Sequence, residues 1–465
     1  MAGALKVDFT PARIALLLAI AGAAALVALA PAPVQFPHAM QGLAIVMMTV
    51  ALFATGALPG LYTALVFFTL ALLSGVAPPL AIISSFWANA TMLIFGGLII
   101  GASAERSGLG RYVARGLMQR FVGSYARLLF GILLGTFALS FLLPSTMGRL
   151  AITIPIVTAI AAEAGYERGS NGYAGLILTT VAGNFTTSYA ILPANLTNVI
   201  VIGAGEAVFG HQLGYVEYLL LCAPVLALVK GLTFIVLALL VYPAPTPAMS
   251  AETQPQPLGR PAKRLAVVLC LTVALWATDV LHGLKPGWIA LGAAILCLLP
   301  PLALVTLREC FDLNRLAAVI IVPAVQGLAA VLTASGAGAL VAAAILKVVP
   351  IEGHSAFFGF LAISVTSAAV ALVATIVGTI AIVTPLIADV ANATGLPAKL
   401  GLIAEITGLQ APFFHYAATP IMVGIAMGSI APSQATRLLF PLALVGLLVV
   451  LPLQALWLKL LGVMP

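Results

Sequence analysis

Long apolar runs separated by short polar stretches follow one another along almost the whole chain. Only 7% of the 465 residues are charged and 62% are apolar, whereas soluble proteins carry about 25% charged residues. A membrane span takes about 20 apolar residues, so the runs accommodate about eleven helices. We therefore predict an all-α polytopic membrane protein, and no polar stretch is long enough for a separate soluble domain.

The charged and reactive residues exclude several function classes. The formal charge of +7 comes from lysines and arginines that lie between apolar runs, so it indicates membrane topology and not nucleic-acid binding. The sequence contains no CxxC pair, no HExxH pair and no phosphate-binding Gly-x-x-x-x-Gly-Lys loop. These patterns argue against an ATP-driven pump and against a membrane-embedded enzyme. We expect no enzymatic activity and no bound cofactor.

A Pro-rich polar segment over residues 243–263 divides the chain. Its composition is typical of a solvated linker between two halves. The predicted organisation is N-terminal scaffold helices over 1–85, a first repeat over 86–242 with a hairpin near 128–163, the cytoplasmic linker, and a second repeat over 264–465 with a hairpin near 355–391.

Two motifs recur in the two halves in the same order. Ser107-Gly108-x-Gly110-x-x-Val113-Ala114 recurs as Ser335-Gly336-x-Gly338-x-x-Val341-Ala342. Gly148-x-x-Ala151-Ile152-x-x-Pro155 recurs as Gly378-x-x-Ala381-Ile382-x-x-Pro385. Either match alone is compatible with chance, but two in register indicate an internal repeat.

The basic residues indicate that the repeats have inverted topology. The segment after the first Ser-Gly motif carries Arg106, Arg111, Arg115, Arg120 and Arg127, whereas its counterpart has Lys347 and no arginine. Cytoplasmic loops of membrane proteins collect lysine and arginine. We therefore place the two segments on opposite sides of a bacterial-type inner membrane, with the N-terminus in the cytoplasm.

Each matched proline follows a polar turn inside an apolar run. The turns are Ser145-Thr146-Met147-Gly148-Arg149 and Thr375-Ile376-Val377-Gly378-Thr379. Backbone groups freed by a turn at membrane depth must be buried in protein or line a wet cavity. We predict two re-entrant helical hairpins, and the N-termini of their second helices favour anions.

The next helix in each half is also interrupted, over residues 183–198 and 407–420. Asn195, Thr197 and Asn198 follow a proline in the first, and His415 and Thr419 lie in the second. A proline kink whose polar groups satisfy one another explains either interruption alone. Their occurrence at matching places in two halves favours unwound helices at a transport site.

On these motifs the chain resembles the divalent anion/sodium symporter family of the ion transporter superfamily. Each half of that family has a hairpin with a Ser-Asn-Thr tip, for which Ser145-Thr146-Met147 and Thr375-Ile376-Val377 are the counterparts. A Pro-Asn pair often follows, matched here by Thr197-Asn198 and, in the second half, by Thr419-Pro420-Ile421. Neither tip keeps the full motif.

The resemblance implies a scaffold and a transport domain, usually in a homodimer, with the anion between the tips and sodium as a possible co-substrate. Because tip asparagines and threonines belong to the family's sodium and carboxylate sites, the departures put sodium coupling in doubt.

Three charged residues lie within or beside apolar runs. Arg149 either binds the anion, or supplies the charge that sodium supplies elsewhere, or is structural, paired with Glu163 or Glu405 or reaching the cytoplasm. Glu405 is either a proton carrier, because burial favours its neutral form, or an ion-pair partner of Arg149 or Lys230. We interpret Lys230 as a lysine at the membrane end of a helix.

The sequence thus predicts a secondary active transporter of a small anion such as a di- or tricarboxylate, sulfate or sulfonate, proton-linked or exchanging, with the bilayer and a second copy as partners and no nucleic acid. A sodium/proton antiporter or an arsenite-type permease is the alternative. The predicted coupling residues are Glu405 and His415. The predicted substrate-binding residues are Ser145, Thr146, Gly148, Arg149, Asn195, Thr197, Asn198, Thr375, Gly378, Thr379, Thr419 and Pro420.

Overall fold

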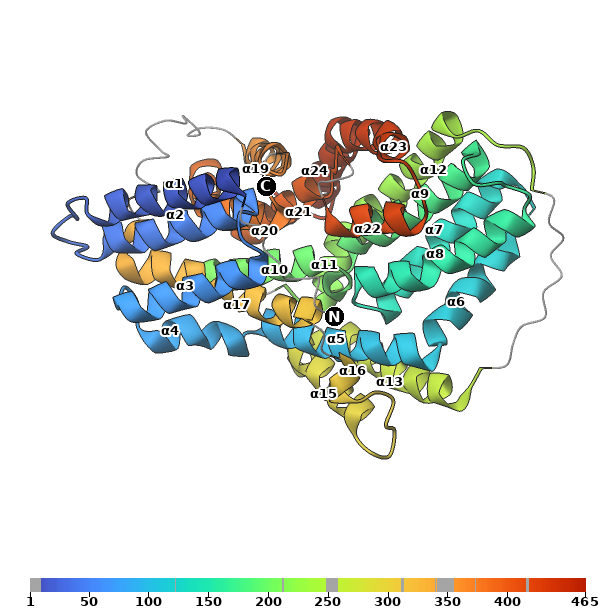
Figure 1. Cartoon of the computed structure of the whole chain (residues 1–465), viewed down its shortest axis with the longest axis horizontal. Helices are drawn as coiled ribbons and strands as arrows, with labels where there is room; N and C mark the ends of the chain where they lie inside the picture. Colours follow the sequence, from blue (N-terminus) through green and yellow to red (C-terminus); the bar gives the residue numbers. More distant parts are fainter. Residues whose placement is uncertain are drawn as a thin grey trace.

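A computed structural model of the chain shows a protein built from helices (Figure 1). It describes residues 10–121, 123–210, 213–247, 258–310, 313–338, 340, 355–372, 374–414 and 418–465. Among these residues, eight helices are long and apolar enough to cross a membrane, and five shorter apolar helices accompany them. The prediction of an all-α polytopic membrane protein is confirmed.

The N-terminal helices lie at one end of the long axis of the molecule (Figure 1). Helix α1 faces outward over most of its length, as a lipid-facing helix does. Helices α2 and α3 pack on α17 (Leu313–Ser335). The N-terminal elements are α1 (Pro11–Ala28), α2 (Ala39–Thr55), α3 (Gly60–Ser74), α4 (Pro79–Ile83) and η1 (Ser84–Trp87).

The hairpin of the first half lies toward the other end of the long axis from the N-terminal helices (Figure 1). Its elements are α5 (Asn89–Ser107), α6 (Leu109–Met118), η2 (Gln119–Phe121), α7 (Tyr125–Leu142), α8 (Thr146–Glu163), α9 (Asn171–Thr186), η3 (Thr187–Ala190), η4 (Leu192–Ala194), α10 (Leu196–Phe209), α11 (Tyr215–Cys222), η5 (Ala223–Val229) and α12 (Lys230–Val241). The hairpin is α7 and α8, and the interrupted helix is α9 and α10.

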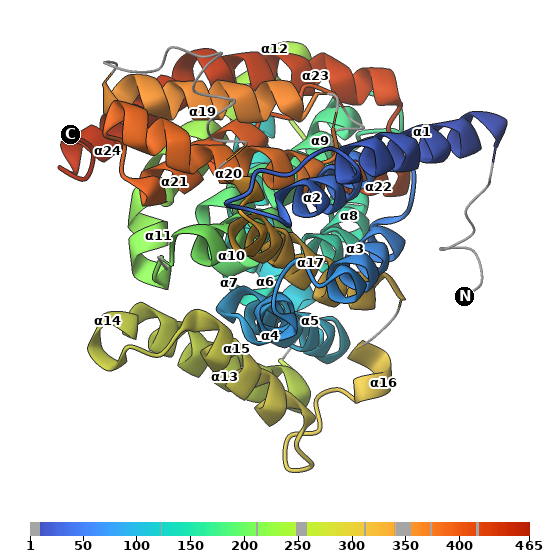
Figure 2. The same cartoon turned by 90° about the vertical axis from the view of Figure 1, so that its left-hand side faces the viewer.

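The second half starts at Arg260, inside the predicted linker, because Pro261 occupies the first turn of its first helix, where proline is favoured. Its elements are α13 (Arg260–Ala277), α14 (Asp279–His282), α15 (Pro286–Leu298), α16 (Leu307–Cys310), α17, α19 (Ala356–Val370), α20 (Ile376–Thr394), α21 (Ala398–Leu409), α22 (Thr419–Met427), α23 (Pro432–Val445), η7 (Gly446–Val450) and α24 (Leu451–Leu460). Here the hairpin is α19 and α20, and the interrupted helix is α21 and α22. Helices α13 to α15 form an outer layer on α5 (Figure 2).

The Ser-Gly part of the first matched motif has the same local structure in both halves, while Val341 and Ala342 of the second copy lie outside the described residues. Helices α5 and α17 end at Ser107 and Ser335, and the glycine that follows each has a left-handed backbone, with φ of 75° at Gly108 and 79° at Gly336. In both, the N–H two residues after the serine donates to its hydroxyl at 3.3 Å. A glycine in this conformation ends a helix without steric cost.

The last long helix of each half contains a π-helical segment. Helices α11 and α12 are joined by η5, which contains Pro224, and α23 and α24 are joined by η7. Such segments free backbone carbonyls and are frequent at functional sites. Gln454 of α24 donates through Nε2 to the carbonyl oxygen of Leu221 at 2.7 Å.

Lys230 follows η5 in the middle of this helix and is only 1% exposed. The interpretation of Lys230 as a membrane-end lysine is therefore wrong. Apolar residues flank it on both sides in the sequence, and sequence alone did not distinguish a lysine that reaches the membrane surface from one held by a buried partner.

Candidate functional site

The first tip, residues 143–149, is ordered by a side-chain cap. Ser145 has an extended backbone, and its Oγ accepts from the N–H of Gly148 at 3.1 Å, so α8 begins directly after it. Helix α5 approaches the tip closely because it has glycines there: a Cβ at Gly97 would lie 3.1 Å from Pro144. The N-terminus of α8 therefore sits against α5 and not in lipid.

Arg149 is fully buried behind this tip. Its Nη1 donates to the carbonyl oxygens of Leu143 at 2.5 Å and Ala194 at 2.9 Å, and its Nη2 donates to Asn184 O at 2.8 Å and to Thr146 Oγ1 at 3.1 Å. The guanidinium thus joins the tip to both sides of the first helix break. Three of the four partners are backbone carbonyl oxygens and the fourth is the Thr146 hydroxyl. Neither Glu163 nor Glu405, which the structural alternative had named, is among them.

The first break, between α9 and α10, is held by two asparagines. Asn198 donates through Nδ2 to the carbonyl oxygens of Ser188, Tyr189 and Ile191 at 3.0–3.3 Å. Asn195 caps α10, since its Oδ1 accepts from the N–H of Thr197 at 3.0 Å. The polar cluster that the sequence shows after Pro193 therefore satisfies the backbone of the unwound segment.

The second tip, residues 371–372 and 374–379, has the same cap but a different neighbour. Thr375 Oγ1 accepts from Gly378 N at 3.1 Å, as Ser145 does at the first tip. The same hydroxyl donates to Phe53 O at 2.5 Å, and Thr375 N donates to Ala54 O at 3.1 Å. A Cβ at Gly378 would lie 2.6 Å from the Cα of Ala54. The second tip is docked onto the end of α2.

The second break, between α21 and α22, is held by Lys230. Its Nζ donates to Gln410 Oε1 at 2.9 Å and also to the carbonyl oxygen of Gln410. Both residues are buried. A buried cation therefore satisfies backbone carbonyls at each break, Arg149 at the first and Lys230 at the second.

Glu405 lies on α21 and is fully buried. Its Oε2 accepts from Thr384 Oγ1 on α20 at 2.8 Å, while its Oε1 has no hydrogen-bond partner among the described residues. Neither Arg149 nor Lys230 forms an ion pair with it, so both ion-pair alternatives are wrong. A single hydroxyl is weak compensation for a buried carboxylate, which favours the neutral acid.

A cavity of about 1000 Å³ lies between the tips and the breaks. Eight predicted site residues line it, and four others lie behind its wall; Glu405 does not line it, and His415 is outside the described residues. The lining predicted residues are Ser145, Thr146, Gly148, Asn195, Thr197, Thr375, Thr419 and Pro420. Those behind the wall are Arg149, Asn198, Gly378 and Thr379.

Glu105 of α5 also lines the cavity, and sequence reasoning missed it. A Cβ at Gly148 would collide with Glu105 Oε1, so the carboxylate lies against the first tip. Its position just before the Ser107-Gly108 motif is a signal that could have been noticed. A carboxylate at the end of an apolar run is a candidate for function by default.

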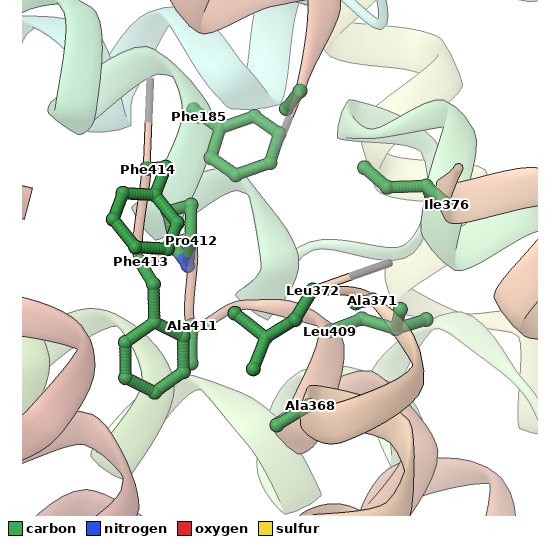
Figure 3. Close-up of a pocket in the computed structure, with 11 residues that line it drawn as sticks. Phe185, Ala368, Ala371, Leu372, Ile376, Leu409, Ala411, Pro412, Phe413 and Phe414 are labelled. Carbon is green, nitrogen blue, oxygen red and sulfur yellow. The ribbon is translucent and has the colours of Figure 1, made fainter. Parts of the chain in front are cut away.

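A small apolar recess opens beside the cavity. Figure 3 shows Phe185, Leu372 and Ile376 around one space, with Phe413 and Phe414 on the side of the second break. Its volume of about 10 Å³ is roughly the least space that one water molecule needs. The recess and the cavity share Phe185, Ala371, Leu372, Ile376 and Ala418.

Comparisons with known proteins agree with this architecture. Residues 12–464 match the family described as the sodium:sulfate symporter transmembrane region. The chain belongs to the sodium:sulfate symporter family. The resemblance to divalent anion/sodium symporters is thereby confirmed, and the chain is a multi-pass membrane protein of a transporter family.

Two individual proteins are similar to the chain. A membrane protein of Cupriavidus necator is 26% identical over 227 residues, which are 47% of this chain and 44% of that protein, so the match spans less than half of the relative. The crystal structure of the YdaH transporter of Alcanivorax borkumensis is similar with a TM-score of 0.58 and 13% identity, over 98% of this chain and 99% of that chain. At this identity the second likeness shows a shared fold.

Proposed function

We propose that this protein is a secondary active transporter that binds a small anion in the cavity and moves it by alternating access. One observation carries the proposal: the capped N-termini of α8 and α10 both contribute residues to one cavity of about 1000 Å³, with the Arg149 guanidinium directly behind. Helix N-termini each present about half a positive charge to an anion. The inverted repeats, the homodimer and the cytoplasmic N-terminus belong to the same proposal.

Thr146 links the buried charge to the cavity. Its hydroxyl oxygen accepts from Arg149 at 3.1 Å, which leaves the hydroxyl hydrogen to donate elsewhere, and the residue lines the cavity. Hydrogen bonds that involve charged groups are about twice as strong as neutral ones. Arg149 therefore acts on the anion through Thr146, and in this conformation its own four bonds go to protein.

We propose that coupling is proton-linked or by exchange and does not use sodium. A sodium ion at a helix break needs carbonyl oxygens as ligands. Four of the carbonyls at the tip and the breaks already accept from Arg149 or Lys230, namely those of Leu143, Asn184, Ala194 and Gln410. The side-chain cations of Arg149 and Lys230 thus occupy carbonyl oxygens that a sodium ion would need as ligands. Glu405, buried against Thr384, is the proposed proton carrier, and His415 stays a prediction.

Uptake into proteoliposomes tests the proposal. We expect an inward proton gradient or a counter-anion inside the vesicle to drive anion uptake, and a sodium gradient to have no effect. Glu405→Gln should abolish the response to the proton gradient, because the amide cannot release a proton. Glu163→Gln, at the exposed end of α8, is the matched control and should behave as the wild type.

A sodium/proton antiporter is the second candidate, because the carboxylate of Glu105 lines the cavity. In that case, sodium added to the purified protein at low buffer strength would release protons, and anions would not change its thermal stability. Sodium-dependent anion uptake that persists in Glu405→Gln would contradict the proton-linked mechanism.

A further inference from the structure

We infer that the headgroup of an anionic phospholipid binds between α6 and the first turn of α13, where α5 passes into the first hairpin. The ligand is a phosphodiester that carries acyl chains, and not a soluble anion. None of the described cavity-lining residues belongs to α6 or α13. The inference therefore stands apart from the proposed function.

Helices α5 and α15 lie side by side and run in the same direction. At their starts, Gly287 N donates to Asn89 Oδ1 at 2.7 Å. One turn or more further along both helices, a Cβ at Gly96 would lie 2.5 Å from the backbone of Ala290. The ends of α5 and α15 therefore lie at the same end of this layer.

The first turn of α13 also lies at that end. Arg264 Nη1 donates to Pro301 O, just after α15, at 3.5 Å. Arg106, in the last turn of α5, donates to Glu309 Oε2 on α16 at 2.5 Å. Helix α6 continues from α5 here and packs on α13 (Figure 1). Segments from both halves of the chain, α6, α13 and α16, thus converge on one surface.

Five exposed cations gather on this surface. Arg111 and Arg115 are one turn apart on α6, so they share a face of that helix. Within the described part of the chain, none of the five forms a hydrogen bond or an ion pair. We call these residues the basic end: Arg111, Arg115, Arg260, Lys263 and Arg308.

Surface lysines at the opposite end of the layer have acidic partners. Lys285, at the start of α15, lies with Nζ 3.6 Å from Glu206 Oε1. Lys399 Nζ donates to Glu217 Oε1 at 2.9 Å, and α11, which carries Glu217, packs on α13. Membrane topology accounts for cations on one side. It does not account for three segments that bring unpaired cations together.

The acids near the basic end are engaged elsewhere. Glu309 bonds to Arg106 and accepts from the N–H and the hydroxyl of Thr306 at 2.8 Å. Glu163 and Glu167 flank Tyr166, whose ring contacts Tyr125 at the start of α7. That contact lies at the far end of the hairpin from the tip. The positive charge of the basic end is therefore left for an external anion.

A lipid fits this surface better than a soluble anion. The chain has eight helices apolar enough to cross a membrane among its described residues, so the surface lies beside a bilayer. Tyr112 and Leu307, next in sequence to Arg111 and Arg308, are 43% and 57% exposed. Guanidinium groups bind phosphate oxygens in pairs, and the two apolar side chains can contact acyl chains. A soluble phosphate would use the cations alone.

Lipid binding to the purified full-length protein in detergent tests the inference. Native mass spectrometry and the midpoint of thermal unfolding are the readouts. The probes are phosphatidylglycerol and phosphatidylcholine with identical acyl chains, and inorganic phosphate. We expect phosphatidylglycerol to bind at least about tenfold more tightly than phosphatidylcholine and to stay bound in excess phosphate. Equal binding of the two lipids overturns the inference, and so does displacement by inorganic phosphate at equal concentration.

Two double variants assign the binding to the two helices. Arg111→Gln with Arg115→Gln changes α6, and Arg260→Gln with Lys263→Gln changes α13. Each pair should weaken phosphatidylglycerol binding about 25-fold, because a cation near an anionic lipid contributes roughly fivefold. Either pair tests the site by itself if the other is not folded. A loss confined to one pair overturns a site shared by both helices.

Lys285→Gln with Lys399→Gln is the matched control, since it removes the same charge at the opposite end of the layer. These side chains are 47% and 40% exposed. Screening separates them from the basic end, so lipid binding should fall by less than about twofold. A loss as large as that of the other pairs would mean that net charge alone attracts the lipid, which overturns the site.

Discussion

The two hairpin tips have the same cap and different neighbours. In each, the hydroxyl of the residue before the second hairpin helix accepts from a glycine N–H at 3.1 Å. The first tip then meets the flexible carboxylate of Glu105, while the second is pressed onto the backbone of Ala54. Both tips line the cavity, and the second is in addition anchored to α2.

The difference shows that two tips with the same local structure can have different surroundings. Arg149 occupies the position of Thr379 in the second tip, and both are fully buried. Arg149 carries a charge next to the cavity, whereas Thr379 donates only to the carbonyl oxygen of Thr375. The first tip therefore has a buried charge behind it, whereas the second tip is held against α2.

Labelling from the two sides of the membrane tests whether the two halves have inverted topology. Arg168 and Lys399 lie in equivalent connections, before α9 and at the start of α21. With Cys270→Ser as background, because Cys270 is the exposed cysteine in the described part, we expect Arg168→Cys to react only from the cytoplasmic side and Lys399→Cys only from the other. Reaction of both from one side would rule out inverted repeats.

Arg149→Met should have the largest effect on stability. Three buried carbonyl oxygens would lose their donor, at about 1 kcal/mol or more each, so the expected loss is at least about 3 kcal/mol. The thermal unfolding of purified protein in detergent measures it. Arg111→Met on the exposed face of α6 is the control and should change stability by less than about 0.5 kcal/mol. An unfolding curve for Arg149→Met equal to that of the control would contradict the joining role of the guanidinium.

Gly378→Ala and Gly148→Ala form a matched pair for the two tips. At Gly378 the new methyl meets the backbone of Ala54, which cannot move aside, so we expect a loss of about 1–3 kcal/mol. At Gly148 it meets the end of the Glu105 side chain, which can rotate away, so stability should change little while anion affinity changes. Equal destabilisation by both would mean that the two tips are docked alike.

Thr146→Val and Thr375→Val separate binding from anchoring with the smallest expected effects. Thr146→Val removes the donor to the anion, so affinity should fall about tenfold with little change in thermal stability. Thr375→Val removes a helix cap and a bond to Phe53, so stability should fall by about 1–2 kcal/mol. A larger loss of anion affinity in Thr375→Val than in Thr146→Val would contradict this division between binding and anchoring.

Sequence reasoning located both tips and both breaks because their signals are local. Glycine, proline and small hydroxyl residues at corresponding places in two halves require no knowledge of distant contacts. The partners of charged residues were harder to predict. Lys230 contacts Gln410, and Glu405 contacts Thr384, across helices that hydropathy alone does not orient. Glu105 was overlooked because it stands at the end of an apolar run beside an arginine-rich segment.

The amino-acid sequence by itself determined that this is a helical membrane protein with a capped turn and an interrupted helix in each half, because apolar length and turn residues act within a few residues of one another. Only the tertiary structure decided which of the two tips, both of which line the cavity, is also anchored to the N-terminal helices. That choice depends on whether Glu105 or Ala54 lies against the tip glycine. Contacts between segments so far apart in the chain follow from how the helices pack, and the pattern of any single helix does not contain them.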